Sequence, residues 1–409
     1  MNISPGVTVR EAARFFAGSR LTLARQLAGL RKVELAARIE KTPTAVAAYE
    51  SGRTRPSPTT VAKLCMALGI EPSFLLPNSG TVHSAEISPH FRSLRVTTQL
   101  VRDQAQAYGR VVYEIMEVLE RHVVLPERDV PSHPVTSERS AGPIQAARLL
   151  REDWGLGSGP ISHLLRASEL HGVVIVFSPP QTATVDAYSF ETISRPIVIL
   201  NPLKDDYYRQ RFDLAHELGH LVMHADVEPG NRAVEEQAHR FAAELLMPAD
   251  ELAKQLPHRA NWPLLQELKE YWGVSLQALL YRGRELGVMS GVTYRNAMAS
   301  MSKEGWRRQE PGARPEVEQP SLLPRALSVL DEVGVDANSL AGEVRVPSKL
   351  FEIVTARVPG MSVEGGASDK RKHSKDGSLN VSQGEVVSLF EPEREEPEGR
   401  NPFPGVSLV

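Results

Sequence analysis

The chain has a single cysteine among its 409 residues. One thiol cannot form an internal disulfide, so the sequence excludes a small secreted scaffold held together by disulfide bonds. Cys65 follows Val61 and Leu64 and precedes Met66 and Leu68. These apolar neighbours predict a small core residue at position 65 rather than a catalytic nucleophile.

The sequence also lacks a signal peptide and any apolar run long enough to span a membrane. We therefore expect a cytoplasmic protein with no membrane partner. The length of the chain and its 41% content of hydrophobic residues suffice for two or three domains with apolar cores.

The most informative segment that is present is His216-Glu217-Leu218-Gly219-His220. Apolar residues at near-helical spacing surround it and no proline interrupts them, so residues 212–224 are predicted to form a buried helix. Two imidazoles four residues apart share one face of a helix and can hold one divalent metal ion, which is typical of zinc hydrolases. Glu217 could then take a proton from water and pass it to a leaving group.

A different interpretation of the same segment is a pair of partly buried histidines that bond backbone carbonyls. In that case Glu217 would be a buried acid without a task, and burying such a group is costly. The metal site is therefore the favoured interpretation, and it needs a third ligand.

Residues 234–248 supply that ligand, because they predict a second helix that stops at Pro248. Glu235 projects from the first turn of the apolar face, which docks inward, whereas Glu236 points about 100° away. Glu235 is the preferred third ligand and Glu236 is the reserve. For either residue the alternative is a solvated carboxylate in a first helical turn.

These segments resemble the ImmA/IrrE-type metallopeptidases, whose domain pairs HELGH with a helix of the form Glu-x-x-Ala-x-x-Phe-Ala followed by Leu-Leu-Met-Pro. The likeness includes residues 211–215 before HELGH and residues 235–248 after it. Residues 173–177 and 195–201 look like the short strands of the family.

The resemblance implies a zincin-like fold with one Zn²⁺ ion held by His216, His220 and Glu235, and with Glu217 as the catalytic base. Many relatives have Glu where this chain has Gln237. This difference favours Glu235 as the ligand and does not exclude Glu236.

Two further histidines lie within reach of the predicted site. His224 follows His220 by one helical turn, and His239 follows Glu235 by one turn. Either could act as an outer-shell partner or as an oxyanion donor. The more common role of such a histidine is packing or surface exposure.

A second module precedes this one. Residues 33–39 predict a helix, Glu40-Lys41-Thr42 a turn, and residues 43–51 a second helix that opens at Pro43 and is closed by Gly52. This is the spacing of a helix-turn-helix motif. The stretch from Leu21 to about Leu76 resembles the Xre/Cro repressors, and the resemblance implies binding to double-stranded operator DNA.

The charge of this module fits that partner. Residues 1–80 contain eleven basic and five acidic residues, a net charge of +6, whereas the whole chain carries −3. Basic side chains that neutralise phosphates release counterions and so favour DNA binding. A solvated basic surface for a protein partner is the alternative.

Four residues outside the base-contacting positions are expected to lie at the DNA interface. Lys32 stands where the family often has Gln and could contact a phosphate as a point charge. Thr42 is placed to cap the recognition helix. Arg53 and Arg55 follow that helix and complete the set.

Base contacts are expected from Thr44, Ala45 and Ala48, the exposed positions of the recognition helix. These side chains offer a hydroxyl and methyl groups rather than the bidentate pairs of Arg or Gln that discriminate bases most sharply. Specificity would then rest on methyl contacts and DNA shape, or be modest.

The predicted architecture is mainly α with a small β-sheet, an α+β fold in which a five-helix DNA-binding domain precedes a zincin-like domain. We expect the helix-turn-helix domain in residues 1–80, a helical connector and linker in 81–143, and the metallopeptidase domain in 144–310. Within the connector, residues 96–124 predict a long amphipathic helix, which could contact a second copy in a dimer or pack on its own domain. An accessory segment in 311–362 and a disordered tail in 363–409 follow.

Two classes of function are consistent with these modules. The first is a DNA-binding regulator with a zinc-dependent endopeptidase domain that cleaves a repressor or antitoxin-like protein. The second is a non-proteolytic transcription factor whose metallopeptidase-like domain senses an effector or zinc. In either case the operator-binding form is expected to be a homodimer, because this kind of motif usually reads two half-sites.

Overall fold

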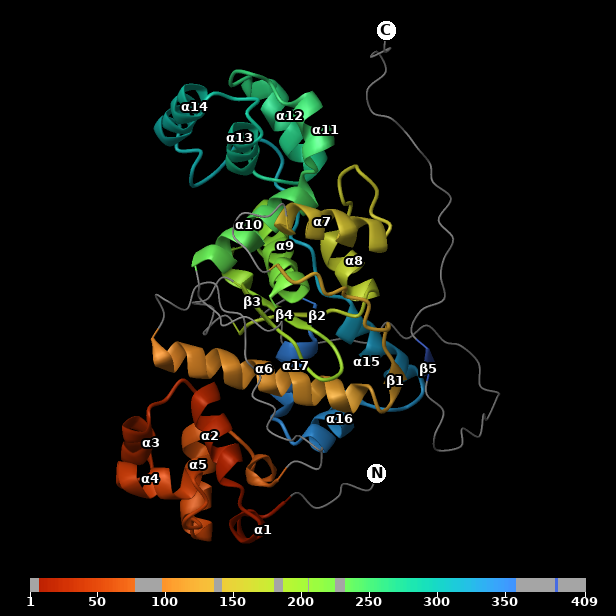
Figure 1. The fold of residues 1–409 in the computed structure, drawn as a ribbon. Coiled ribbons are helices and arrows are strands. Elements are labelled where there is room, and N and C mark those ends of the chain that lie inside the picture. Colours follow the sequence, from red (N-terminus) through yellow and green to blue (C-terminus); the bar gives the residue numbers. More distant parts are fainter. Residues whose placement is uncertain are drawn as a thin grey trace.

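The computed structural model describes residues 7–77, 98–135, 142–179, 187–204, 206–224, 232–357 and 387–388. Helices dominate these ranges and strands are few, which confirms the predicted mainly α fold with a small sheet (Figure 1). The tail expected to be disordered lies outside the described residues, apart from β5 (Val387–Ser388), which pairs in parallel with β1 (Val123–Val124). No helix in these ranges combines the length and the apolar character that a membrane span requires.

The N-terminal domain consists of short helices around one apolar core. They are α1 (Val9–Arg14), α2 (Gly18–Leu27), α3 (Lys32–Arg38), α4 (Pro43–Glu50), α5 (Pro58–Leu68) and the 3₁₀ helix η1 (Pro72–Leu75). Leu35, Ile39, Val46 and Leu64 are fully buried in this core, as their apolar spacing predicts. Thr42 accepts a hydrogen bond from the backbone N–H of Ala45 and so caps α4.

A three-stranded sheet forms the centre of the second domain. Its strands are β2 (Val174–Phe177), β3 (Ala187–Phe190) and β4 (Ile197–Leu200), in the order β2-β4-β3. β4 is parallel to β2 and antiparallel to β3. All three strands are buried along their whole length, because helices cover both faces.

Alternate residues of the strands face two different cores. Tyr188 and Phe190 belong to the core that contains α6 (Gln99–Leu119), and Ala187 belongs to the core that contains α9 (Tyr207–Met223). This alternation follows from the two-residue period of a strand. It places Ser189 on the side of α9.

Helix α6 lies between the sheet and the N-terminal domain (Figure 1). The Tyr108 hydroxyl donates to the Phe177 carbonyl at 2.8 Å, and the Tyr188 hydroxyl donates to the Ala105 carbonyl at 3.2 Å. Gly109 permits the close approach, since a Cβ atom there would lie 2.7 Å from the Phe190 ring. The long helix expected over residues 96–124 is therefore a packing layer of the second domain.

Four helices cover the other face of the sheet: α7 (Gly142–Asp153), α8 (Leu164–Leu170), α9 and α10 (Arg232–Leu246). Residues 125–135, expected as part of a linker, are held against this layer. The Trp154 indole donates to the Asp129 carbonyl at 2.8 Å, and the His133 N–H donates to the Val222 carbonyl at 2.7 Å.

The remaining helices extend the second domain at two ends (Figure 1). They are α11 (Ala249–Gln255), α12 (Trp262–Trp272), α13 (Leu276–Glu285) and α14 (Gly291–Lys303), followed by α15 (Leu322–Glu332), α16 (Ala337–Val344) and α17 (Ser348–Thr355). The last three return to the core of α6, so the accessory segment supports the face of the sheet opposite α9.

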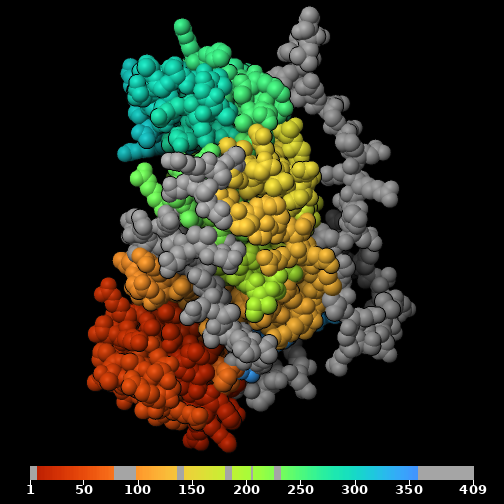
Figure 2. Space-filling model, in the orientation of Figure 1, coloured from red at the N-terminus to blue at the C-terminus, as the bar shows by residue number. Residues whose placement is uncertain are grey.

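The N-terminal domain is docked on α6 (Figure 2). Arg20 of α2 pairs with Glu114 of α6 at 2.7 Å, and both side chains are almost fully buried. Arg20 also donates to the Phe74 carbonyl at 2.9 Å, while Gln104 donates to the Leu27 carbonyl at 2.9 Å. A buried arginine that is partnered on both domains ties the two together.

Candidate metal centre and nucleic-acid interface

Helix α9 presents both histidines of the HELGH segment to one place. The Asp206 carboxylate accepts from the Arg209 N–H and caps the helix, which then runs without interruption to Met223. His216 and His220 are each 1% exposed. Their Nε2 atoms lie 3.1 Å apart, as expected for side chains one helical turn apart.

Helix α10 crosses α9 and brings Glu235 to the two imidazoles. The Glu235 Oε2 atom lies 3.4 Å from His216 Nε2, and its Oε1 atom lies 3.8 Å from His220 Nε2. The three candidate ligand atoms all lie within 4.8 Å of one another. Glu236 is exposed on the next position of the helix and is outside this group.

Two imidazole nitrogens and one carboxylate oxygen form a donor set that fits catalytic zinc, which uses three protein ligands and leaves a position open. The histidines are buried, whereas the Glu235 side chain is 23% exposed. The site can therefore be reached from the side of α10.

Glu217 is held by a residue that the sequence did not reveal. Ser189 of β3 donates from its hydroxyl to Glu217 Oε2 at 2.7 Å, and both residues are buried. This bond occupies one carboxylate oxygen and fixes the orientation of the group. A four-residue strand that contains a serine carries no signal that would single out Ser189.

Of the two extra histidines, His224 lies beside His220 and joins it to α10. His224 Nδ1 lies 3.2 Å from His220 Nδ1, and His224 Nε2 lies 2.8 Å from Gln237 Oε1. Burial lowers the pKa of the His224 imidazole, and the hydrogen bond with Gln237 opposes this only in part. The His239 ring is tilted against the Phe212 ring, with ring centres 4.8 Å apart, and it meets the His216 ring edge to face, with ring centres 6.1 Å apart.

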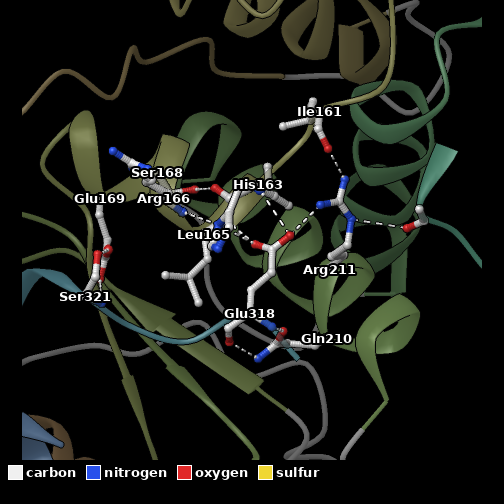
Figure 3. Close-up of polar contacts among 12 residues, drawn as sticks. Ile161, His163, Leu165, Arg166, Ser168, Glu169, Gln210, Arg211, Glu318 and Ser321 are labelled. Carbon is white, nitrogen blue, oxygen red and sulfur yellow. Dashed lines mark hydrogen bonds and ion pairs between the residues drawn. The ribbon is translucent and has the colours of Figure 1, made fainter. Parts of the chain in front are cut away.

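A buried polar network fixes the first half of α9 (Figure 3). Arg211 pairs with Glu318 through Nη1 and donates to the Ile161 carbonyl through Nη2 at 2.6 Å. Glu318 also accepts from the backbone N–H groups of Leu164 and Leu165 at 3.2 and 2.6 Å. The segment after α14 is thus locked to α8 and α9 by charge-assisted hydrogen bonds.

Two groups of this network have shifted pKa values. Burial raises the pKa of the Glu318 carboxyl, but its hydrogen bond with His163 and the charge of Arg211 outweigh burial, so the pKa lies below its ordinary value. The same hydrogen bond raises the pKa of His163. Nothing in the sequence marks Glu318 as a buried residue, because it lies in a segment rich in Pro, Arg and Glu.

The helix-turn-helix residues lie as the motif requires. Glu40 adopts the left-handed conformation with φ 54° in the turn, and Pro43 opens α4. Figure 1 shows α3 and α4 on the outer side of the domain, whereas the residues that pack against α6 belong to α2, α5 and the segment around η1. The candidate recognition helix is therefore accessible to a duplex.

The candidate DNA contacts differ in exposure. Thr44, Arg53 and Arg55 are exposed, and Ala45 and Ala48 are half-buried. Arg53 donates to the Ser51 hydroxyl at 3.0 Å, and Arg55 donates to the Arg14 carbonyl at 2.9 Å. These bonds restrain two positive charges next to the end of α4.

Not all the positive charge of the domain faces solvent. Arg25 is buried and pairs with Glu50 at 2.5 Å, and Lys32 reaches the same carboxylate at 3.3 Å while its side chain is 48% exposed. Arg20 is buried against α6. Arg20 and Arg25 therefore stabilise the fold and add little to the basic surface that a duplex would meet.

Cys65 is half-buried and packs against the core of the N-terminal domain, rather than lying inside it as its apolar neighbours suggested. Burial raises the pKa of its thiol to about 11. The thiolate that a nucleophile requires is therefore scarce at neutral pH.

Comparison with known families assigns two regions of the chain. Residues 21–75 match the family described as helix-turn-helix, and residues 168–283 match the peptidase M78 family described as the IrrE N-terminal-like domain. The second region contains α9 and α10, and with them His216, Glu217, His220 and Glu235. A comparison with curated proteins found no match. Residues 21–75 therefore carry an Xre-type helix-turn-helix domain, and residues 168–283 carry an IrrE N-terminal-like domain of the M78 metallopeptidase-like family.

Proposed function

We propose that the protein is a DNA-binding transcriptional regulator whose second domain is a zinc-dependent endopeptidase that cleaves a repressor or antitoxin-like protein. The observation that carries this proposal is the convergence of His216, His220 and Glu235 within 4.8 Å, with Glu217 on the same helix as the two histidines. Double-stranded operator DNA, bound by a homodimer, is the proposed partner of the first domain.

Zinc is the proposed ion because two histidines and one glutamate form the ligand set of a well-known class of zinc peptidases. When bound there, zinc would polarise the scissile carbonyl and lower the pKa of an adjacent water molecule. Glu217 would take the proton of that water through the carboxylate that Ser189 orients, and would pass it to the leaving amine. Ser189 keeps the base in one rotamer.

A cavity of about 420 Å³, lined in part by His239, offers room for a polypeptide segment. Its walls include Phe212, His239, Tyr281 and Trp306, so aromatic surfaces are available to bind side chains. His239 lines this cavity and also lies next to His216, with ring centres 6.1 Å apart. We propose that the substrate enters along this route.

The proposal can be tested with the full-length protein and three variants. Purified wild-type protein should contain one zinc per chain by elemental analysis, and His216→Ala should contain none. Glu217→Gln should retain zinc, because the base is not a proposed ligand. Glu236→Gln provides a matched control next to Glu235 and should behave as the wild type.

Activity should be measured by comparing new protein N-termini in host cells that express the wild type or Glu217→Gln. We expect some new N-termini to appear only in cells that express the wild type. The proteins that carry these N-termini are then purified, and the wild-type enzyme should cleave them in the absence of chelator but not in its presence. Equal N-termini in both strains, together with unchanged reporter expression, would instead favour the non-proteolytic transcription factor.

A further inference from the structure

Three buried side chains are joined by successive polar contacts that begin at one candidate zinc ligand. His220 Nδ1 lies 3.2 Å from His224 Nδ1, and His224 Nε2 lies 2.8 Å from Gln237 Oε1. His224 is 0% exposed and Gln237 is 9% exposed. These contacts therefore join α9 to α10 on the side of His220 that faces away from Glu235.

The chemistry of the last member determines where the protons lie. The Gln237 Oε1 atom can only accept, so His224 Nε2 carries a proton and donates it. The two facing Nδ1 atoms need one donor and one acceptor. If His220 donates, its Nε2 atom keeps a lone pair that points toward His216 Nε2 and Glu235 Oε1, 3.1 and 3.8 Å away.

The opposite direction of the hydrogen bond between His220 and His224 would leave no lone pair for a metal ion. If His224 donated from Nδ1, the neutral His220 ring would carry its proton on Nε2, at the position where a metal ion must bind. Only the first arrangement directs a lone pair of His220 into the centre. A ligating histidine generally donates its other ring N–H to such a partner, which fixes both the tautomer and the ring orientation.

We infer that His224 and Gln237 are positioning residues that hold His220 in the tautomer and orientation required to bind zinc. The inference rests on the proposed function, since it assigns a role toward the zinc ion of that site. Gln237 acts only through His224. The neutral amide supplies an acceptor without adding negative charge to the centre.

The test is a competition between the full-length protein and a zinc chelator of known affinity. His224→Leu and Gln237→Leu should each weaken zinc binding by about 10- to 100-fold, the usual effect of losing an outer-shell partner. Gln237→Glu keeps an acceptor oxygen at the same position. It should restore affinity to within about threefold of the wild type or exceed it, because a carboxylate makes the ligand more basic.

A double variant tests whether Gln237 acts through His224 or whether each residue contributes only by packing. His224→Leu combined with Gln237→Leu should bind zinc no more weakly than His224→Leu alone, because Gln237 has nothing to orient once His224 is lost. Two independent packing losses would add. Additive losses, or zinc affinity unchanged in both single variants, would overturn the inference.

Two controls keep the result interpretable. His171→Leu removes a histidine that stacks on Trp154 at 4.4 Å, away from the centre, and should leave zinc affinity unchanged even if stability falls. Unfolding of each variant in chelator reports whether the zinc-free fold is intact. If the wild type itself binds no zinc, both the proposed function and this inference fail, whereas unchanged variants of a zinc-binding wild type overturn the inference alone.

Discussion

Ser189 donates a 2.7 Å hydrogen bond to Glu217, so a short strand holds the carboxylate that lies between the two candidate zinc ligands. The pair joins β3 to α9 inside the core, where both side chains are buried and a hydrogen bond is stronger than in bulk water. Loss of this bond should therefore affect the base and leave the ligands in place.

Ser189→Ala should lower kcat for the identified substrate by roughly 10-fold, because hydrogen bonds to charged groups contribute about 1.5–3 kcal/mol and part of this orients the base. Zinc content should not change, since Ser189 bonds the base rather than a proposed ligand. Steady-state kinetics and elemental analysis measure the two effects. Ser168→Ala is the matched control, because Ser168 is equally buried but donates to the Leu164 carbonyl. Equal losses in both variants would show that general loosening, not Glu217, is responsible.

The Arg20–Glu114 pair should dominate the docking of the two domains. Glu114→Gln should lower the free energy of unfolding by about 3–5 kcal/mol, because it leaves Arg20 buried with its charge uncompensated. Urea denaturation of the full chain measures this loss. The double variant with Arg20→Met should lose less than the sum of the single variants.

An exposed ion pair just after α6 supplies the comparison. Arg121→Gln breaks the contact between Arg121 and Glu343, whose side chains are 45% and 37% exposed, and should cost less than about 1 kcal/mol. A similar loss at both pairs would contradict the special role of Arg20.

The network of Glu318 and His163 predicts a stability window in pH. The pKa of Glu318 is lowered in the folded protein, so its contribution is present above the ordinary value of 4.5 and is lost as pH falls through the folded pKa. The pKa of His163 is raised, so its contribution is full below 6.5 and is lost as pH rises through the folded pKa. Both contributions are favourable between these values.

Urea denaturation across a pH range of about 2 to 8 checks this window with two variants. The stability difference between the wild type and Glu318→Gln should shrink toward the acid end, and the difference for His163→Gln should shrink toward the alkaline end. Differences that stay constant across the range would rule out the assigned protonation states.

Arg53→Ala should weaken DNA binding to all sequences alike. If Arg53 contacts one phosphate, the slope of log affinity against log salt should fall by about 0.9. Binding should be measured by fluorescence anisotropy on a duplex selected from a random library. Arg166→Ala changes an exposed arginine of α8 and should leave the slope as it is. A slope that is unaltered in Arg53→Ala would remove this residue from the interface.

Helical periodicity explains why part of the site could be predicted. The face shared by His216 and His220, and the choice of Glu235 over Glu236 as the nearer carboxylate, both follow from 3.6 residues per turn within one helix. The core of the helix-turn-helix domain follows from the same rule. The relative directions of side chains within one helix can be predicted without knowing how the rest of the chain folds.

The missed features depend on contacts between segments distant in sequence. The strand from Ala187 to Phe190 has only four residues, one of them a buried serine whose partner is on α9. Glu318 looks like a surface charge until Arg211 and the start of α8 are placed beside it. The amphipathic pattern of α6 predicted a helix, but its position between two domains depends on partners from both.

The contact of Gly109 with Phe190 gives α6 a role in the candidate centre that it does not touch. A single added methyl group would force the helix and the aromatic ring apart, since the Cβ atom of an alanine at position 109 would lie 2.7 Å from the Phe190 ring. The neighbour of that ring in the strand is the serine that orients the base. A larger residue at position 109 would therefore be expected to displace β3 and with it the carboxylate of Glu217. Helix α6 is thus constrained on one side by its contacts with the DNA-binding domain and on the other by the position of the proposed catalytic base.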